Sequence, residues 1–224
     1  MKKFVVAENR EEKARKIEYV LSDFLNQEIK KKKILDIGTG TGEIADYFSK
    51  NNEVYSVDVL DQRKNKKSKI IFKQVKSEKL PFKNNFFDVV ISNHVIEHLE
   101  NQKLHLQEIK RVLKQNGVSY LATPNKLFPW ETHNKVLLIH YLPKKWFNLI
   151  LKKTNKYQED IYLITYFKLK KLLAEQFNYE EYTHKIIKYP NKYGFKIPIL
   201  NKFPEFIIQK LNFISQTNVF VLRR

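Results

Sequence analysis

Short apolar runs alternate with amphipathic stretches along most of the chain. We predict strands where an apolar run is bounded by turn residues, and helices where apolar residues recur every three or four positions. The predicted strands are 33–37, 53–58, 69–75, 86–92, 117–123, 179–187 and 217–222, and the predicted helices are 9–29, 43–50, 100–115 and 165–177. Because strands and helices alternate with short connections, the sequence predicts a parallel, doubly wound α/β sheet whose ligand lies at the carboxyl ends of the strands.

Three amphipathic segments accompany this core. Residues 9–29 carry an apolar stripe that would cover the sheet or roof the ligand cleft. Residues 143–153 place Trp146 and Phe147 among four lysines. That pattern fits either a helix on a bilayer surface or a lid packed over the cleft with solvated lysines. Residues 198–214 repeat the apolar theme, and two such elements favour an apolar or lipid-linked molecule beside the cleft.

A glycine-rich turn follows the first predicted strand. Glycines at 38, 40 and 42 can take a positive φ and let the backbone approach a ligand closely, and the next helix offers unpaired N–H groups. Asp36 precedes the turn. A dinucleotide fingerprint requires glycine at the position of Glu43, so the G-x-G-x-G spacing favours another nucleotide-like ligand.

A second carboxylate ends the next predicted strand, about 20 residues after the turn, where a ribose diol is bound in related architectures. This residue is Asp58. A solvated carboxylate at a strand end is the alternative interpretation.

The glycine turn resembles motif I of the class I S-adenosylmethionine (SAM)-dependent methyltransferases. Five later segments occur in the same order as signatures of the methyltransferase type 11 group, namely Leu80-Pro81-Phe82, Phe87-Asp88-Val89-Val90, Glu97-His98-Leu99, Arg111-Val112-Leu113-Lys114 and Thr123-Pro124-Asn125. The resemblance covers about residues 30–125 well. It implies a Rossmann-like, mostly parallel seven-stranded sheet with helices on both faces, an antiparallel last strand and helical lid insertions.

The resemblance also implies an organisation and a cofactor. One domain would span residues 1–224, with an N-terminal helix in 1–30, a SAM-binding core in 31–125, and substrate or lid insertions at 126–161 and 188–216. SAM would be the cofactor. The residues that would bind it are Asp36, Gly38, Thr39, Gly40, Gly42, Asp58, Val59, Ser77, Glu78, Asn93 and His94.

The composition of the chain excludes several kinds of site. The chain has 224 residues and no cysteine, which excludes disulfides, thiolate zinc sites and iron–sulfur chemistry. The first residues lack the apolar core of a signal peptide and no long apolar run occurs, so we expect a cytoplasmic protein. A net charge of +18 favours anionic partners such as nucleic acid or an anionic membrane surface, although a lysine-rich compositional bias explains it equally well.

We predict methyl transfer to a hydroxyl of a small, sugar or lipid-linked acceptor, with RNA methylation as the alternative. A hydroxyl acceptor must lose a proton, and histidine is the side chain best matched to that role near neutral pH. The candidates for this base are His133 first and His98 second, with His94 also near the cleft; a structural role is the alternative for each. Residues 92–95 lack the motif that serves base amino groups, which counts against base N-methylation. One carboxylate and one imidazole at Glu97-His98 make a poor metal site, so we predict no metal.

Overall fold

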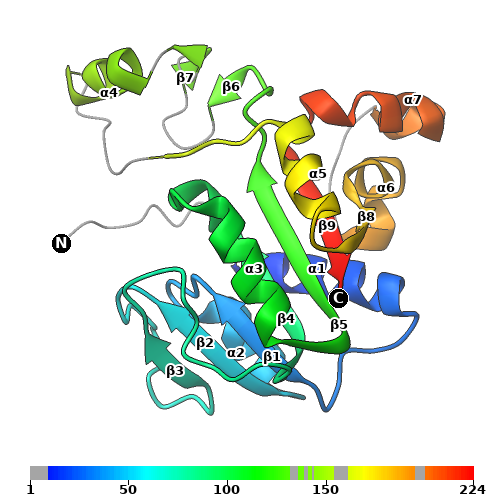
Figure 1. Ribbon diagram of the computed structural model, residues 1–224. Coiled ribbons are helices and arrows are strands. Elements are labelled where there is room, and N and C mark those ends of the chain that lie inside the picture. The colour runs from blue at the N-terminus through cyan, green and yellow to red at the C-terminus, as the bar shows by residue number, and fades with distance from the viewer. Residues whose placement is uncertain (1–9, 132–135, 139–140, 143, 154–160, 195–199) are drawn as a thin grey trace.

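The structure is a computed structural model that describes residues 10–131, 136–138, 141–142, 144–153, 161–194 and 200–224. Its centre is a seven-stranded sheet with the strand order β3-β2-β1-β4-β5-β9-β8 (Figure 1). The strands of this sheet are β1 (Lys33–Ile37), β2 (Glu53–Asp58), β3 (Ile71–Gln74), β4 (Phe87–Asn93), β5 (Leu113–Pro124), β8 (Asn178–Glu181) and β9 (Thr217–Arg223). Strands β1 to β5 pair in parallel, whereas β9 is antiparallel to both β5 and β8. The predicted fold class is confirmed.

Helices cover both faces of the sheet. The α-helices are α1 (Arg10–Leu25), α2 (Glu43–Ser49), α3 (Gln102–Val112), α4 (Lys144–Lys153), α5 (Tyr166–Ala174), α6 (Thr183–Lys188) and α7 (Glu205–Lys210). The described residues also form four short 3-10 helices: η1 (Ile96–His98), η3 (Pro190–Tyr193), η4 (Leu200–Lys202) and η5 (Asn212–Ile214).

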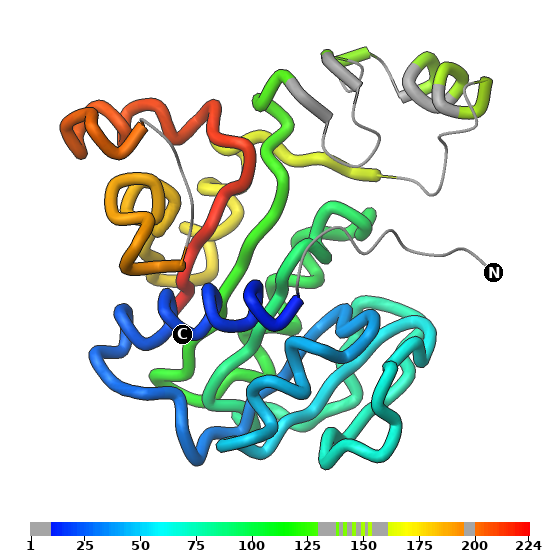
Figure 2. Tube along the Cα trace, turned by 180° about the vertical axis from the view of Figure 1, so that it is seen from behind, coloured from blue at the N-terminus to red at the C-terminus, as the bar shows by residue number. Residues whose placement is uncertain are grey.

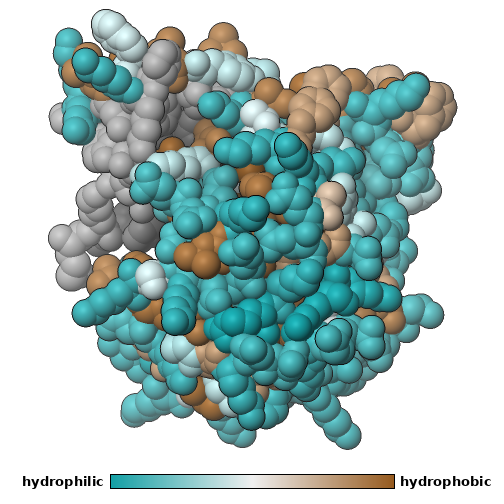
Figure 3. Space-filling model, viewed as in Figure 1, coloured by the Kyte–Doolittle hydropathy of each residue, from teal (hydrophilic) through white to brown (hydrophobic). Residues whose placement is uncertain are grey.

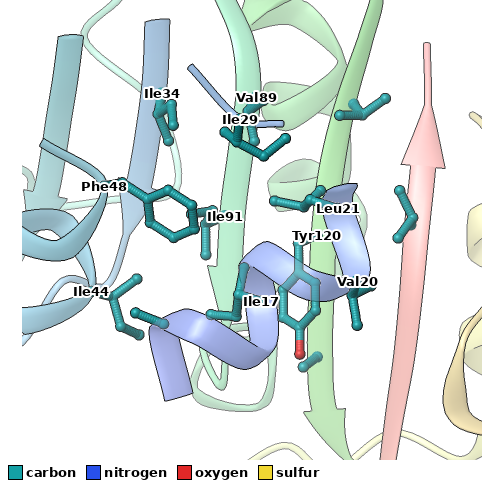
Figure 4. Packing of buried hydrophobic residues seen from close by; sticks show 14 of the residues in the cluster. Ile17, Val20, Leu21, Ile29, Ile34, Ile44, Phe48, Val89, Ile91 and Tyr120 are labelled. Atoms are coloured by element: carbon teal, nitrogen blue, oxygen red, sulfur yellow. The ribbon is translucent and has the colours of Figure 1, made fainter. Parts of the chain in front are cut away.

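Helix α1 covers the sheet. This was one of the two alternatives predicted for residues 9–29, the other being a roof over the ligand cleft. Its residues Ile17, Val20 and Leu21 are buried in one apolar cluster with residues of α2 and with Ile91 and Tyr120 of the sheet (Figure 4). The view from behind shows α1 lying across this face (Figure 2). Its first residue, Arg10, reaches the glycine turn, so the helix also borders the candidate site.

Helices α3 and α5 pack on the opposite face. Leu106 and Ile109 of α3 and Leu169 and Leu173 of α5 share a second buried cluster with β4, β5 and β9. Burial of the sheet on both faces explains why its central strands read as continuous apolar runs rather than as alternating patterns.

Contacts join two of the motifs recognised in the sequence, Leu80-Pro81-Phe82 and Arg111-Val112-Leu113-Lys114. Arg111 donates to both carboxylate oxygens of Glu108 at 2.7 Å and to the carbonyls of Phe82 (2.7 Å) and Leu80 (2.9 Å). Glu108 in turn accepts the Leu80 N–H at 2.7 Å. The carboxylate and guanidinium of α3 therefore hold the turn at residues 80–82, and this pair stabilises the fold.

The prediction of a strand at 179–187 is wrong beyond Glu181. Tyr182 and Ile186 both enter the cluster beneath α1, and their spacing of four residues places them on one face of a helix. The Thr183 hydroxyl accepts the Val219 N–H at 2.9 Å, where pairing with β9 ends. The chain then continues as α6 rather than as a strand.

The regions outside the core also differ in detail from the prediction. Residues 144–153 do form a helix, α4. Residues 200–214 are not one amphipathic helix but the three short helices η4, α7 and η5. A small sheet of β6 (Trp130–Glu131) and β7 (Val136–Leu137), which the sequence did not predict, lies between β5 and α4 (Figure 1).

Candidate cofactor and acceptor site

The glycine turn folds against the carboxyl end of β2. Gly38, Gly40 and Gly42 have φ values of +68°, +53° and +84°. The Gly38 N–H donates to the Val57 carbonyl at 2.9 Å, and the Gly40 N–H donates to Asp58 Oδ2 at 2.7 Å. Because the turn is tied to β2, the two elements that would embrace a nucleotide-like ligand form one unit.

Close approach also requires glycine at Gly38, whereas at Gly40 the nearest atom is the movable end of a side chain. A Cβ at Gly38 would lie 2.6 Å from Val95 Cγ2, a distance that real Cβ atoms do not reach. A Cβ at Gly40 would lie 2.9 Å from Nη1 of Arg10. The turn therefore brings β1 into contact with the end of β4 on one side and with α1 on the other.

Asp36 lies beneath the turn, at the carboxyl end of β1. Only 2% of the residue is exposed, and its Oδ2 has no hydrogen-bond partner among the described residues. Burial raises the pKa of this carboxyl to about 7, the nearby Asp58 charge adds to the rise, and Thr39 and Arg10 oppose it. Such a carboxyl can accept a hydrogen bond from, or pair with, a cationic group of a ligand that enters the turn.

The carboxylate of Asp58 could accept hydrogen bonds from a diol. Its Oδ2 accepts the Gly40 N–H and its Oδ1 accepts the Val59 N–H at 2.7 Å. A carboxylate has about four lone-pair sites, so acceptor capacity remains for ligand hydroxyls. The next residues, Val59 and Leu60, are 60% and 57% exposed, and such apolar side chains can pack against a planar ring.

The remaining predicted cofactor residues lie at the same edge of the sheet. Gln74, the last residue of β3, pairs in register with Asp58, and its amide donates to the Val59 carbonyl at 2.7 Å. Ser77 and Glu78 follow shortly after that point; Ser77 is exposed and Glu78 half-buried. Thr39 is buried within the turn.

The end of β4 carries Asn93 and His94. His94 has a φ of +58°, a backbone conformation that is uncommon for a residue other than glycine. Its N–H donates to the Ala122 carbonyl of β5 at 2.8 Å, and its Nδ1 lies 3.2 Å from Oε1 of Glu97. The His98 N–H, which follows one turn later, donates to the Val95 carbonyl at 2.9 Å.

The sequence did not predict that a buried polar cluster lies behind His94. Glu97 is fully buried, and its Oε2 accepts the Thr123 hydroxyl at 3.0 Å. His105 of α3 is 1% exposed, with its Nε2 3.0 Å from the Ser92 hydroxyl. Burial lowers the pKa of His105 to about 4, so this ring is neutral at physiological pH. The one signal in the sequence was a histidine among the apolar positions of the predicted helix 100–115.

Asn125, the last residue of the Thr-Pro-Asn motif, joins the segment after β5 to α5 and to the end of η5. Its Nδ2 donates to the carbonyls of Phe213 (2.8 Å) and Ser215 (3.0 Å), and its Oδ1 accepts the N–H groups of Leu127 (3.0 Å) and Tyr166 (3.3 Å). The motif is therefore structural. His133, the first candidate for the base, lies outside the described residues.

Metal ligands do not gather in the described part of the chain: no group of three or more His, Asp or Glu side chains there could hold a metal ion. The donor set at the glycine turn instead fits SAM. A buried carboxyl at Asp36, a diol acceptor at Asp58 and a turn that excludes Cβ atoms match a cationic amino acid joined to a nucleoside.

Comparisons with known proteins agree with this geometry. Residues 35–121 match a family model described as a methyltransferase domain. The chain is 29% identical over 122 residues to a ubiquinone biosynthesis O-methyltransferase of Pelagibacter ubique, covering 49% of this chain and 50% of that protein. It is 32% identical over 98 residues to a demethylmenaquinone methyltransferase of Chlorobaculum parvum, covering 41% of each. The chain thus spans about half the length of the curated relatives it matches.

Solved structures support the fold over nearly the whole chain. A crystal structure of a protein from Pyrococcus horikoshii superposes with a TM-score of 0.64 at 17% identity, covering 97% of this chain and 92% of that one. An S-adenosylmethionine-dependent methyltransferase from Mesorhizobium loti gives a TM-score of 0.60 at 12% identity, covering 92% and 97%. The sheet order, the glycine turn and the family match agree: residues 35–121 match a methyltransferase domain, and they lie in a sheet that superposes on an S-adenosylmethionine-dependent methyltransferase.

Proposed function

We propose that the protein transfers a methyl group from SAM to a small, lipid-like acceptor. The observation that carries the proposal is the arrangement of Asp36, the glycine turn and Asp58 at adjacent strand ends. Asp58 would hold the ribose diol, Val59 would contact the adenine, and Asp36 would stabilise the cationic methionine end through the turn. Bound SAM supplies an electrophilic methyl group on a sulfonium, and the protein's main contribution is to hold the acceptor in line with it.

The acceptor class rests on two lines of support. The relatives named above are methyltransferases of ubiquinone and menaquinone synthesis, one of which is named for transfer to oxygen. The predicted insertions at 126–161 and 188–216 would bind an apolar acceptor beyond the end of β5. We propose that the acceptor atom is a hydroxyl oxygen and that His133 or His98 lies near it. None of the relatives named above is an RNA methyltransferase, so the RNA alternative has no support.

Exposed apolar side chains on the acceptor side support a lipid-like substrate. On α4, Trp146, Leu149 and Ile150 are 59%, 43% and 36% exposed beside the exposed Lys145 and Lys152. Brown patches at the top of Figure 3 lie over α4 and over α7. The apolar side chains exposed from η4 to η5 are Leu200, Phe203, Phe206, Leu211 and Ile214. Apolar residues bordered by lysines suit the surface of an anionic bilayer, from which such an acceptor would be taken.

Among the described residues, no helix combines the length and the apolar character needed to cross a bilayer. The bilayer contact that we propose is therefore peripheral for this part of the chain.

Calorimetry with S-adenosylhomocysteine, the demethylated product, tests the cofactor site. We expect the wild-type protein to bind it and to gain thermal stability, because a ligand specific for the native state stabilises that state. Asp58→Ala removes the diol acceptor and should weaken binding. Glu53→Ala, at the opposite end of the same strand, is the matched control. Equal affinity in Asp58→Ala and Glu53→Ala would reject the proposed role of Asp58, and a wild-type protein without measurable affinity would reject the function.

Sedimentation with vesicles of anionic phospholipid tests the lipid side. Trp146→Glu with Leu149→Glu should abolish sedimentation and leave S-adenosylhomocysteine affinity unchanged, because each buried apolar side chain contributes roughly 1.5–3 kcal/mol that a carboxylate loses. Ile71→Glu changes a residue of β3 that is 43% exposed and should sediment like the wild type. Salt-sensitive retention on RNA without vesicle binding would overturn the lipid-like class.

A further inference from the structure

The buried carboxylate of Glu97 is the least expected feature at the acceptor side of the site. Its side chain has no exposed surface, and it lies on η1 directly after β4. A buried carboxylate is costly unless cationic or hydrogen-bonding groups compensate it. Burial raises the pKa of Glu97, but the hydrogen bond and charge of His94 and the charge of His98 outweigh burial and hold the pKa below its usual range.

His94 connects this carboxylate to the surface. Its Nδ1 faces Glu97 Oε1 at 3.2 Å, while 34% of its side chain is exposed. The ring therefore lies between the buried carboxylate and solvent. The following residue, Val95, contacts the Gly38 position of the cofactor turn, so His94 lies at the junction of the cofactor side and the acceptor side.

The backbone of His94 shows that this position is maintained at a cost. Its φ of +58° is uncommon for a residue with a Cβ. The N–H bond to Ala122 and the packing of η1 against β5 fix the conformation. Uncommon backbone conformations of this kind cluster at active sites, where the surrounding structure holds them.

We propose that His94 and Glu97 form a dyad in which His94 is the general base for the acceptor hydroxyl and Glu97 is the positioning residue. This inference rests on the proposed function and deepens it. In this dyad Nδ1 of His94 carries the proton and lies 3.2 Å from Oε1 of Glu97, and the unprotonated Nε2 is the base. The acceptor proton moves to Nε2 as the acceptor oxygen forms its bond to the methyl carbon, and the electrons of the broken carbon–sulfur bond remain on sulfur. The imidazolium that results is compensated by the Glu97 charge.

The surrounding groups are consistent with this assignment. Facing Glu97 are His94 and His98 from its own segment, His105 from α3 and the Thr123 hydroxyl from β5. His105 is neutral, and the Thr123 hydroxyl donates to the oxygen of Glu97 that His94 does not face. The two oxygens of the carboxylate therefore have separate tasks: Oε2 anchors it to β5 and Oε1 orients His94.

The tautomer of His94 tests the dyad without any acceptor. In a neutral histidine ring only one of the two nitrogens carries a proton. The hydrogen bond made by the other nitrogen determines which one it is. We expect nitrogen NMR of the full-length, labelled protein to show the Nδ1–H tautomer at His94, with its signals assigned by their loss in His94→Gln. A neutral His94 with the proton on Nε2 would overturn the proposal.

Chemical modification tests the role of Glu97. Diethyl pyrocarbonate acylates unprotonated imidazole nitrogens, and mass spectrometry locates the product. We expect His94 to be modified in the wild type. In Glu97→Gln the rate of modification of His94 should fall several-fold, while the affinity for S-adenosylhomocysteine stays unchanged. Glu97→Asp, which keeps the charge, should recover part of the rate and covers the case in which the amide variant fails to fold. The same rate in wild type and both variants would reject a positioning role, whereas loss of cofactor affinity in the wild type would reject the proposed function instead.

Discussion

The buried carboxyl of Asp36 makes the stability of the protein depend on pH in a way that one substitution removes. Burial raises the pKa of Asp36 from 3.8 to about 7 in the folded state. A carboxyl with a raised folded-state pKa retains its proton in the native protein over a pH range in which the unfolded chain has lost it. The stability contributed by this proton is present below about pH 4, falls as the pH rises from 4 to 7, and is constant above 7.

The size of the effect follows from the shift. A rise of about three units corresponds to roughly 4 kcal/mol at about 1.4 kcal/mol per unit. Between pH 5 and pH 8 the wild type should lose roughly 3 kcal/mol of this contribution. Asp36→Asn is nearly isosteric and cannot ionise. Its free energy of unfolding, relative to the wild type, should therefore increase by about that amount between the two pH values.

Urea denaturation followed by circular dichroism at pH 5 and pH 8 measures this difference. The comparison of two proteins at two pH values cancels the titration of all other groups. Asp61→Asn is the matched control, because Arg63 lowers the pKa of Asp61 to about 2 and the residue is ionised at both pH values. Equal changes for wild type and Asp36→Asn would refute the reasoning and show that Asp36 is ionised in the native state.

Three further variants test separate parts of the molecule. Gly38→Ala should lose about 1–3 kcal/mol of stability in urea denaturation, because its φ is positive and its Cβ would displace Val95; unchanged stability would contradict this geometry. Arg111→Ala should lose about 2–4 kcal/mol in the same assay, because Glu108 and the carbonyls of the 80–82 turn lose their donors, and a loss below about 0.5 kcal/mol would contradict that role. His133→Ala should lower turnover on the order of 10²–10⁴-fold if this residue is the base, and full turnover in His133→Ala together with its loss in His94→Gln would assign the base to His94.

Local signals were sufficient for the cofactor half of the site. Strands β1 and β2 agree with the predicted ranges, since apolar runs ended by Asp36-Ile37 and Asp58 carry their own boundaries. The positive φ values at Gly38 and Gly40 follow from residue type. Each of these inferences needed only neighbours in the sequence, and that is why they could be made without the structure.

The acceptor half depends on contacts between distant segments. The pairing of Glu97 with Thr123 joins residues 26 positions apart, and the burial of His105 depends on how α3 packs on β4. The same limitation explains the misassigned end of 179–187, because alternating and helical patterns overlap in a short segment and only the cluster beneath α1 favours the helix. No local pattern distinguishes a buried ionised carboxylate from a solvated one.

The four hydrogen bonds of the Asn125 side chain have a consequence for how this protein can change. They fasten the exit of β5, the start of α5 and the turn after η5 to a single amide. The groups that Asn125 contacts in both segments proposed for the acceptor are backbone N–H and carbonyl groups, so this attachment does not depend on the side chains there, whereas Tyr193 is attached separately, through its hydroxyl to Asp23. Such an attachment lets the acceptor half diverge, or be exchanged between relatives by grafting, while the cofactor half keeps its geometry.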